Sequence, residues 1–232
     1  MNEGRHRTVR SFVRRAGRIT TAQSRAIRDL WSRFGVERGS VPLDLDALFG
    51  RRAKRYLEIG FGNGETLTEL AVRHPDRDYL GVEVYEPGIG RLLLALEERD
   101  LANVRVMAAD AVEVLEQQIP DASLDGVFVF FPDPWPKKRH HKRRLIQPPF
   151  VSLIARKLKA GAILHLATDW KPYAEQMLAI LEAGPCFDNT AGTGAYAQRP
   201  DSRPATKFER RGERLGFEVR DLLFRRNDKP AE

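Results

Sequence analysis

The stretch "YLEIGFGNGE", residues 56–65, decides the fold class of this chain. An apolar segment runs directly into a turn with glycines at positions 60, 62 and 64, and a helical pattern, "ETLTELAVRH", begins at residue 65. Glycines between a strand and a helix let the backbone turn sharply and let a ligand approach the main chain closely. The stretch therefore predicts the first strand, turn and helix of an open α/β sheet, with a ligand at the turn.

The alternation of strand and helix that begins here continues through most of the chain. Further apolar strand patterns cover residues 79–84, 104–109, 125–131 and 162–168. The helical patterns that follow them cover residues 87–100, 111–119, 149–158 and 171–183. Five strand–helix units, with strands that are apolar at consecutive positions, predict a doubly wound, mostly parallel sheet with right-handed crossovers. A last strand is predicted in "FEVRDLLFRR", residues 217–226.

The length of 232 residues suits one domain with an extension, and we expect that domain over residues 51–232. Residues 1–50 are predicted to be a basic N-terminal extension, partly disordered, in which residues 20–36 form a helix capped by Thr20 or Thr21. The single cysteine, Cys186, excludes a disulfide framework and a cysteine-based metal site, so we expect no metal. It also fits a reducing compartment, and we expect the cytoplasm. No apolar run approaches the roughly 18 residues of a membrane span.

The basic charge of the chain is concentrated in two places. The net charge is +7, yet residues 1–33 alone hold nine arginines and two acids, and Lys137–Arg144 hold six cationic residues. The rest of the chain is therefore net acidic. Clustered cations of this kind attract polyanions, which predicts a nucleic acid partner.

The residues around the glycine turn predict a pocket for a nucleoside without phosphates. The dinucleotide pattern G-x-G-x-x-G is broken because Glu65 stands where the third glycine would be, and a glutamate in the first turn of a helix repels a pyrophosphate. Glu83 closes the second strand, where an acid can accept ribose hydroxyls. Asp110 follows the third strand and either meets the amino group of adenine or caps the next helix.

Glu58 lies inside the first strand, where a buried carboxylate needs a partner. It either holds the glycine turn or meets a cationic ligand. An adenosine without phosphates that carries a positive group points to S-adenosylmethionine as cofactor, held at Gly60 and Gly62 and by the acids of the pocket. S-adenosylhomocysteine would then be the product.

The second decisive stretch is "FVFFPDPWPKKRHHKRR", residues 128–144. Prolines on both sides of Asp133 rule out a helix, so the carboxylate is held on a stiff loop at a strand end. Open α/β folds place their chemistry at such ends. The alternative is a turn residue that binds its own backbone.

From about Val9 to Phe224 the chain resembles the bacterial tRNA (guanine-N7-)-methyltransferase family. The motifs that carry the resemblance are "RSFVRRAGRIT", "LEIGFGNGE", "GVEVYEPG", "AADAVEVL", "FFPDPWPKKRHHKRR", "ATDWKPYAE" and "RPATKFERRGERLG". The resemblance implies a Rossmann-like class I methyltransferase fold, in which a C-terminal strand pair completes a seven-stranded sheet. It implies methyl transfer from S-adenosylmethionine to N7 of a guanine in the variable loop of tRNA, at tRNA position 46, giving 7-methylguanosine.

The resemblance also implies roles for single residues. The implied contacts with S-adenosylmethionine are made by Glu58, Glu83, Asp110 and Asp133. The implied contacts with tRNA are made by Lys137, Asp169, Thr206, Lys207, Phe208 and Glu209. Pro136 departs from the family pattern, which commonly has histidine there, and this puts a side-chain role at that position in doubt.

The chemistry of guanine N7 predicts the role of Asp133. N7 of guanine has an in-plane lone pair and no proton, so in-line displacement needs no obligatory general base, and Asp133 is expected to orient the reactants and stabilise charge. Either Asp169 or Glu209 could accept hydrogen bonds from N1–H and the amino group of guanine. The alternative role is a helix cap for Asp169 and a surface charge for Glu209. Phosphates of the tRNA backbone are expected to contact Lys138, Arg139, Lys142, Arg143 and Arg144.

Two other functions remain open from the sequence. The chain could be a different S-adenosylmethionine-dependent enzyme, acting on the exocyclic amine of adenine or on protein. It could also be an RNA-binding module without catalysis. We expect a monomer, with a homodimer as the alternative.

Overall fold

The computed structural model describes residues 17–200, 203, 204, 209, 216 and 218–231. The α-helices are α1 (Thr21–Phe34), α2 (Leu45–Phe49), α3 (Glu65–Arg73), α4 (Glu86–Glu98), α5 (Ala111–Gln117), α6 (Pro148–Lys157) and α7 (Lys171–Ala183). The strands are β1 (Lys54–Ile59), β2 (Arg77–Glu83), β3 (Val104–Ala108), β4 (Leu124–Phe130), β5 (Leu158–Thr168), β6 (Phe187–Asn189) and β7 (Arg220–Arg226). One 3₁₀-helix, η1, covers Lys138–Arg143, within the basic run Lys137–Arg144.

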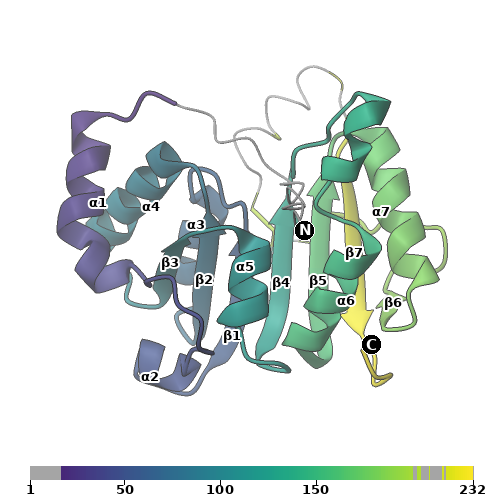
Figure 1. The fold of residues 1–232 in the computed structure, drawn as a ribbon, viewed down its shortest axis with the longest axis horizontal. Helices are drawn as coiled ribbons and strands as arrows, with labels where there is room; N and C mark the ends of the chain where they lie inside the picture. The colour runs from purple at the N-terminus through teal and green to yellow at the C-terminus, as the bar shows by residue number, and fades with distance from the viewer. Residues whose placement is uncertain (1–16, 201–202, 205–208, 210–215, 217, 232) are drawn as a thin grey trace, which may run out of the picture.

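The strands form one seven-stranded sheet in the order β3-β2-β1-β4-β5-β7-β6. The first five strands pair in parallel, and β7 runs antiparallel to both β5 and β6. The order reverses at β1, where the crossovers change direction from β2 to β4 (Figure 1). The doubly wound sheet predicted from the residue patterns is confirmed, and so is the C-terminal strand pair that the family resemblance implied.

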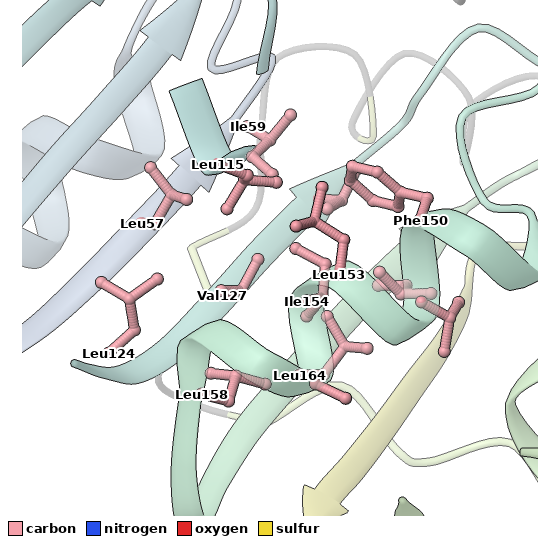
Figure 2. Close-up of a cluster of buried hydrophobic side chains, with 14 of the residues drawn as sticks. Leu57, Ile59, Leu115, Leu124, Val127, Phe150, Leu153, Ile154, Leu158 and Leu164 are labelled. Carbon is pink, nitrogen blue, oxygen red and sulfur yellow. The ribbon is translucent and has the colours of Figure 1, made fainter. Parts of the chain in front are cut away.

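Helices cover both faces of the sheet, and each face has its own hydrophobic core. On one face, Leu57, Val127 and Leu164 of the central strands pack with Leu153 and Ile154 of α6 (Figure 2). On the other face, α1, α3 and α4 pack over β2 and β3, with Phe34 and Leu92 fully buried. Burial on both faces explains why the strands are apolar at consecutive positions.

The helix predicted within residues 1–50 is present and packs on the domain. Thr20 caps α1, because its hydroxyl accepts from the amide of Gln23 while the Gln23 side chain accepts from the Thr20 amide. Helix α1 lies beside α4 (Figure 1), and the amide of Val36 donates to the carbonyl of Val106 at the edge of β3. Residues 1–16, the Arg-rich start of the predicted extension, lie outside the described residues.

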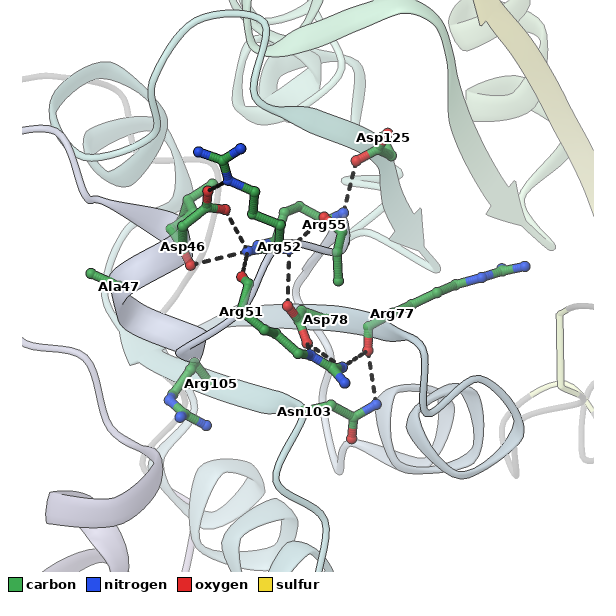
Figure 3. Close-up of polar contacts among 12 residues, drawn as sticks. Asp46, Ala47, Arg51, Arg52, Arg55, Arg77, Asp78, Asn103, Arg105 and Asp125 are labelled. Atoms are coloured by element: carbon green, nitrogen blue, oxygen red, sulfur yellow. Dashed lines mark hydrogen bonds and ion pairs between the residues drawn. The ribbon is translucent and has the colours of Figure 1, made fainter.

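A buried ion network closes the edge of the sheet where β1 and β2 begin (Figure 3). Asp78 is fully buried and lies 2.5 Å from the guanidinium of Arg51 and 2.9 Å from that of Arg55. Arg55 is itself buried and also contacts Asp46, at the second residue of α2. The network joins α2 to both strands at the edge opposite the glycine turn.

Replacing Asp78 with asparagine should lower the free energy of unfolding by about 3 kcal/mol, because the buried Arg55 loses the buried one of its two carboxylate partners and keeps only the half-exposed Asp46. Urea unfolding at pH 7 measures this loss. The exposed neighbour Asp76 provides the control, since Asp76→Asn should change the stability by no more than about 0.5 kcal/mol. Equal stability of the two variants would contradict the structural role of the network.

Candidate functional site

Four of the predicted site residues lie at the edge of the sheet where the parallel strands end. Glu83 is the last residue of β2, and Asp110 follows β3 by two positions. Asp133 follows β4 by three positions, and Asp169 comes directly after β5. Because β4 and β5 pair in register up to Phe130 and Ala167, the Asp133 and Asp169 segments leave the sheet side by side.

The glycine turn presents an open backbone surface at this edge. Gly60 and Gly62 have φ values of +73° and +57°, which favour glycine, and a Cβ atom on either would meet no other described atom within 4 Å. Helix α4 packs against the turn so closely that a Cβ atom on Gly88 would lie 2.0 Å from the carbonyl oxygen of Gly62. Glu65 is the first residue of α3, as predicted, and so disfavours a phosphate at that helix end.

Glu83 holds the glycine turn with its carboxylate. Oε2 accepts from the amide of Gly62 at 2.9 Å, and Oε1 accepts from the amides of Val84 and Tyr85 at 2.7 and 3.0 Å. A carboxylate has about four acceptor positions, so these bonds leave one for a ligand hydroxyl. Burial raises the pKa of Glu83 in spite of these bonds, and the charge of nearby Asp133 adds to the effect.

Glu58 is the most unusual group of the site. It is 3% exposed, and its Oε2 atom has no hydrogen-bond partner among the described residues. Burial, together with the charge of Glu83, raises the pKa of Glu58 to about 8. A buried acid without a partner is costly unless a cation or donor meets it, and this fits a cationic ligand better than a bond to the glycine turn.

Asp110 caps α5, because its Oδ1 atom accepts from the amide of Val112 at 2.9 Å. Of the two predicted roles of Asp110, the helix cap is therefore observed in the structure. The cap uses one oxygen of the carboxylate, so capping and an adenine contact through the other oxygen are compatible.

The loop that carries Asp133 has an unusual backbone. Phe131 and Trp135, two residues on either side of Asp133, have φ values of +52° and +44°. A bulky residue in this left-handed region costs roughly 1–2 kcal/mol, so the surroundings must hold it there. Such backbone conformations concentrate at functional sites.

Arginines of the basic run hold this loop from one side. The guanidinium of Arg144 donates to the carbonyl of Pro134 at 2.8 Å and also contacts the side chain of Gln176 on α7. The guanidinium of Arg143 lies 5.0 Å from the centre of the Trp135 ring, a cation–π distance. These contacts stabilise the strained backbone around Asp133.

The basic run therefore has an inner and an outer part. Lys137, Lys138, Arg139 and Lys142 are exposed, as a phosphate contact requires. Arg143 is half-buried against Trp135. The predicted phosphate contact of Arg144 is not supported, because this residue is only 3% exposed and its guanidinium packs 4.8 Å above the Tyr173 ring.

The two candidates for reading a guanine differ in exposure. Asp169 is exposed, and it is not the cap of α7, because that position is Trp170. Glu209 is 2% exposed and forms an ion pair with Arg203 at 2.6 Å, so it is not the surface charge of the alternative reading. Thr206, Lys207 and Phe208 lie outside the described residues.

Sequence reasoning missed three polar residues that the structure joins to Glu209. They are Arg203 in the C-terminal loop, His165 inside β5 and Asp221 inside β7. A signal was available in the sequence, because His165 interrupts the apolar pattern of residues 162–168 and Asp221 adjoins the apolar run of residues 222–224. Their pairing depends on the antiparallel contact of β5 and β7.

Two kinds of site are not found in the described part of the chain. No group of three or more histidine, cysteine, aspartate or glutamate side chains there could hold a metal ion. No helix there combines the length and apolar character of a membrane span.

Comparison with known proteins places this chain in a family. The model of a family described as putative methyltransferases matches residues 52–222. A tRNA (guanine-N(7)-)-methyltransferase of Alkalilimnicola ehrlichii is 60% identical over 97% of this chain and 95% of its own length. Proteins of the same name from Burkholderia mallei and Pseudomonas paraeruginosa are 59% and 55% identical, over 95% and 96% of this chain and 83% and 91% of their own lengths.

Solved structures share the fold at low sequence identity. The 16S rRNA methyltransferase KamB superposes with a TM-score of 0.59 and 17% identity, over 84% of this chain and 99% of its own. A 16S rRNA (adenine(1408)-N(1))-methyltransferase of Catenulisporales acidiphilia gives a TM-score of 0.55, also at 17% identity, over 84% of this chain and 100% of its own.

The raised pKa of Glu58 predicts how stability without a ligand depends on pH. Since the folded-state pKa lies above the unfolded value of 4.5, the folded protein keeps a proton that the unfolded chain loses, and stability falls as the pH rises from 4.5 to 8. Glu58→Gln should remove this part of the fall, so that above pH 8 the variant is more stable than the parent. Urea unfolding between pH 5 and pH 9 measures the difference.

Glu98→Gln, at an exposed position on α4, is the control and should leave the pH dependence of the parent unchanged. A Glu58→Gln variant that is no more stable than the parent at pH 9 would show that Glu58 is not an uncompensated buried acid.

Proposed function

Because the chain belongs to the tRNA (guanine-N7-)-methyltransferase family, we propose that it transfers a methyl group from S-adenosylmethionine to N7 of a guanine in tRNA. The proposed target is the guanine at tRNA position 46 in the variable loop, and the product is 7-methylguanosine. The observation that carries the proposal is the buried Glu58 on the strand that leads into an open glycine turn, whose Oε2 atom has no hydrogen-bond partner among the described residues.

The residues at the strand ends fit the donor. When bound, S-adenosylmethionine supplies a methyl group activated by a positively charged sulfur. Glu58 would compensate positive charge on the donor, and the remaining acceptor position of Glu83 would take a ribose hydroxyl. The oxygen of Asp110 that does not cap α5 would accept from the amino group of adenine. Gly60 and Gly62 would let the nucleoside approach the backbone.

Asp133 would act on the guanine. N7 has a lone pair in the plane of the ring and no proton, so its attack needs no general base. Positive charge appears on the purine as the methyl group arrives, and a carboxylate held in place stabilises that charge without reorganising. Phe131 and Trp135 fix the backbone on both sides of Asp133 in advance. Positioning and electrostatics, and not proton abstraction, are the proposed sources of the rate.

The exposed part of the basic run would hold the tRNA backbone beside the target base. Lys137 ends the loop that carries Asp133, and the 3₁₀-helix η1 that follows it carries Lys138, Arg139 and Lys142. Contacts with phosphates position an RNA but carry no sequence information, so recognition of the target rests on RNA shape and on the exposed base. Asp169, which is exposed at the neighbouring strand end, would accept from the guanine edge.

We further propose that the enzyme works as a monomer in the cytoplasm. The single cysteine suits a reducing compartment.

A labelled-methyl assay on unmodified tRNA tests the proposed function. The label should enter the tRNA, and chemical cleavage at 7-methylguanosine should map it to one nucleotide of the variable loop. Asp133→Asn should keep tRNA affinity and lower turnover at least about 100-fold, because the charge that faces the purine is lost. Label in adenine or in protein, or full turnover by Asp133→Asn, would refute the assignment.

The salt dependence of tRNA binding tests the division of the basic run. Changing Lys138 and Lys142 together to methionine should reduce the slope of log K against log salt by about 1–2, because each lost phosphate contact removes roughly one released counterion. Arg144→Met should leave this slope unchanged and instead lower thermal stability. A reduced slope for Arg144→Met would show that its guanidinium reaches the RNA.

A further inference from the structure

Four polar side chains form a buried chain across the strands next to the Asp133 loop. The Nε2 atom of His165 lies 2.7 Å from Oδ1 of Asp221, and Arg203 lies between Asp221 and Glu209. Arg203 donates to both oxygens of Asp221 at 2.6 and 2.9 Å, and to both oxygens of Glu209 at 2.6 and 2.7 Å. The side chain of Arg203 is 1% exposed, so it does not serve as an outer contact for RNA.

Packing alone does not explain this cluster. Taking charges out of water is costly, and apolar side chains of similar volume commonly replace buried ion pairs without a loss of stability. A guanidinium that binds two carboxylates in bidentate fashion adds fixed geometry, which apolar packing does not. The position of Arg203 indicates what this geometry serves.

Arg203 stacks on the residues that lead into the Asp133 loop. Its guanidinium carbon lies 5.7 Å from the centre of the Phe130 ring and 5.9 Å from that of Phe131. Phe131 has the left-handed backbone described above, and its amide donates to the carbonyl of Ala167 at 2.8 Å. Arg203 therefore supports the strained side of the loop that Arg143 and Arg144 do not reach in the described contacts.

We propose that Arg203 is a positioning residue for methyl transfer, which fixes the Asp133 loop through Phe131 and is itself fixed by Asp221 and Glu209. This inference rests on the proposed function and adds a residue to its machinery. It also assigns Glu209 to the support of Arg203, because both its oxygens bind that guanidinium. Asp169 is then the acid that reads the guanine edge.

Arg203→Lys is the variant that tests the inference, since lysine keeps the charge but cannot bind two carboxylates in bidentate fashion. Turnover per donor-binding site should fall about 10- to 100-fold, as expected for a displaced catalytic group, while donor affinity stays at the parent value. Arg199→Lys is the matched control: Arg199 is half exposed, lies 3.5 Å from Glu209, and its replacement should change turnover less than about threefold.

Hydrogen exchange provides a readout that does not depend on activity. In Arg203→Lys, amides in a peptide covering residues 128–135 should exchange faster, and those in a peptide covering residues 57–65 should not change. If Arg203→Lys does not fold, Asp221→Asn decides, because it keeps the shape of the site but binds Arg203 through one oxygen. Asp221→Asn should likewise speed exchange over residues 128–135 and leave exchange over residues 57–65 unchanged.

The outcomes separate this inference from the function on which it rests. If the parent protein methylates guanine N7 and the folded variants match its turnover per donor-binding site, Arg203 is not a positioning residue and the function stands. A parent that does not modify tRNA refutes the function, and the exchange experiment still decides whether Arg203 holds the loop. Unchanged exchange over residues 128–135 would overturn the inference.

Discussion

The site depends on acidic side chains that are held close together at the edge of the sheet, in a protein that is basic as a whole. Glu58 is buried on β1 without a hydrogen-bond partner among the described residues, Glu83 lies next to it, and Asp133 is close enough to raise the pKa of Glu83. Carboxylates gathered in this way repel one another unless a cation joins them. A donor with a positively charged sulfur and a purine that becomes cationic both meet this need, and a pyrophosphate does not. The arrangement of acidic groups therefore favours cationic ligands over anionic ones.

The cations near this edge divide into those that face the solvent and those that shape the protein. Lysines of the basic run are exposed and suit phosphates, whereas Arg144 and Arg203 are buried and bind carbonyl, carboxylate and aromatic groups. The planar guanidinium suits the second task, because it can donate several hydrogen bonds and stack at once. The loop between the two groups keeps a left-handed backbone at Phe131 and Trp135. Arg143 and Arg144 contact this loop after Asp133, and Arg203 contacts it before Asp133. The loop can therefore hold Asp133 in place before the reactants bind.

The sequence predicted the elements of the fold well, because buried parallel strands and the glycine turn leave local patterns. The cap of α1 by Thr20, the strand ends at Glu83 and Asp110 and the last strand could all be predicted from short stretches. The inward role of Arg144 could not, because its neighbours in sequence are exposed lysines and its partners lie on another loop and on α7. Glu209 was expected at a surface or at the guanine, and its burial follows from an ion pair with Arg203 that only the folded chain brings together. Long-range pairs of polar groups are the part of this site that local patterns do not encode.

The central claim, that Glu58 is a buried acid which ionises to meet a cationic donor, is tested most directly by calorimetry. Donor binding is measured at pH 7 in buffers of different ionisation enthalpy. With a pKa of about 8, Glu58 is protonated before binding, so binding of S-adenosylmethionine should release about one proton. Adenosine, which lacks the positive group, should release none, and Glu58→Gln should abolish the release for S-adenosylmethionine. Binding of S-adenosylmethionine to the parent protein without proton release would contradict the account.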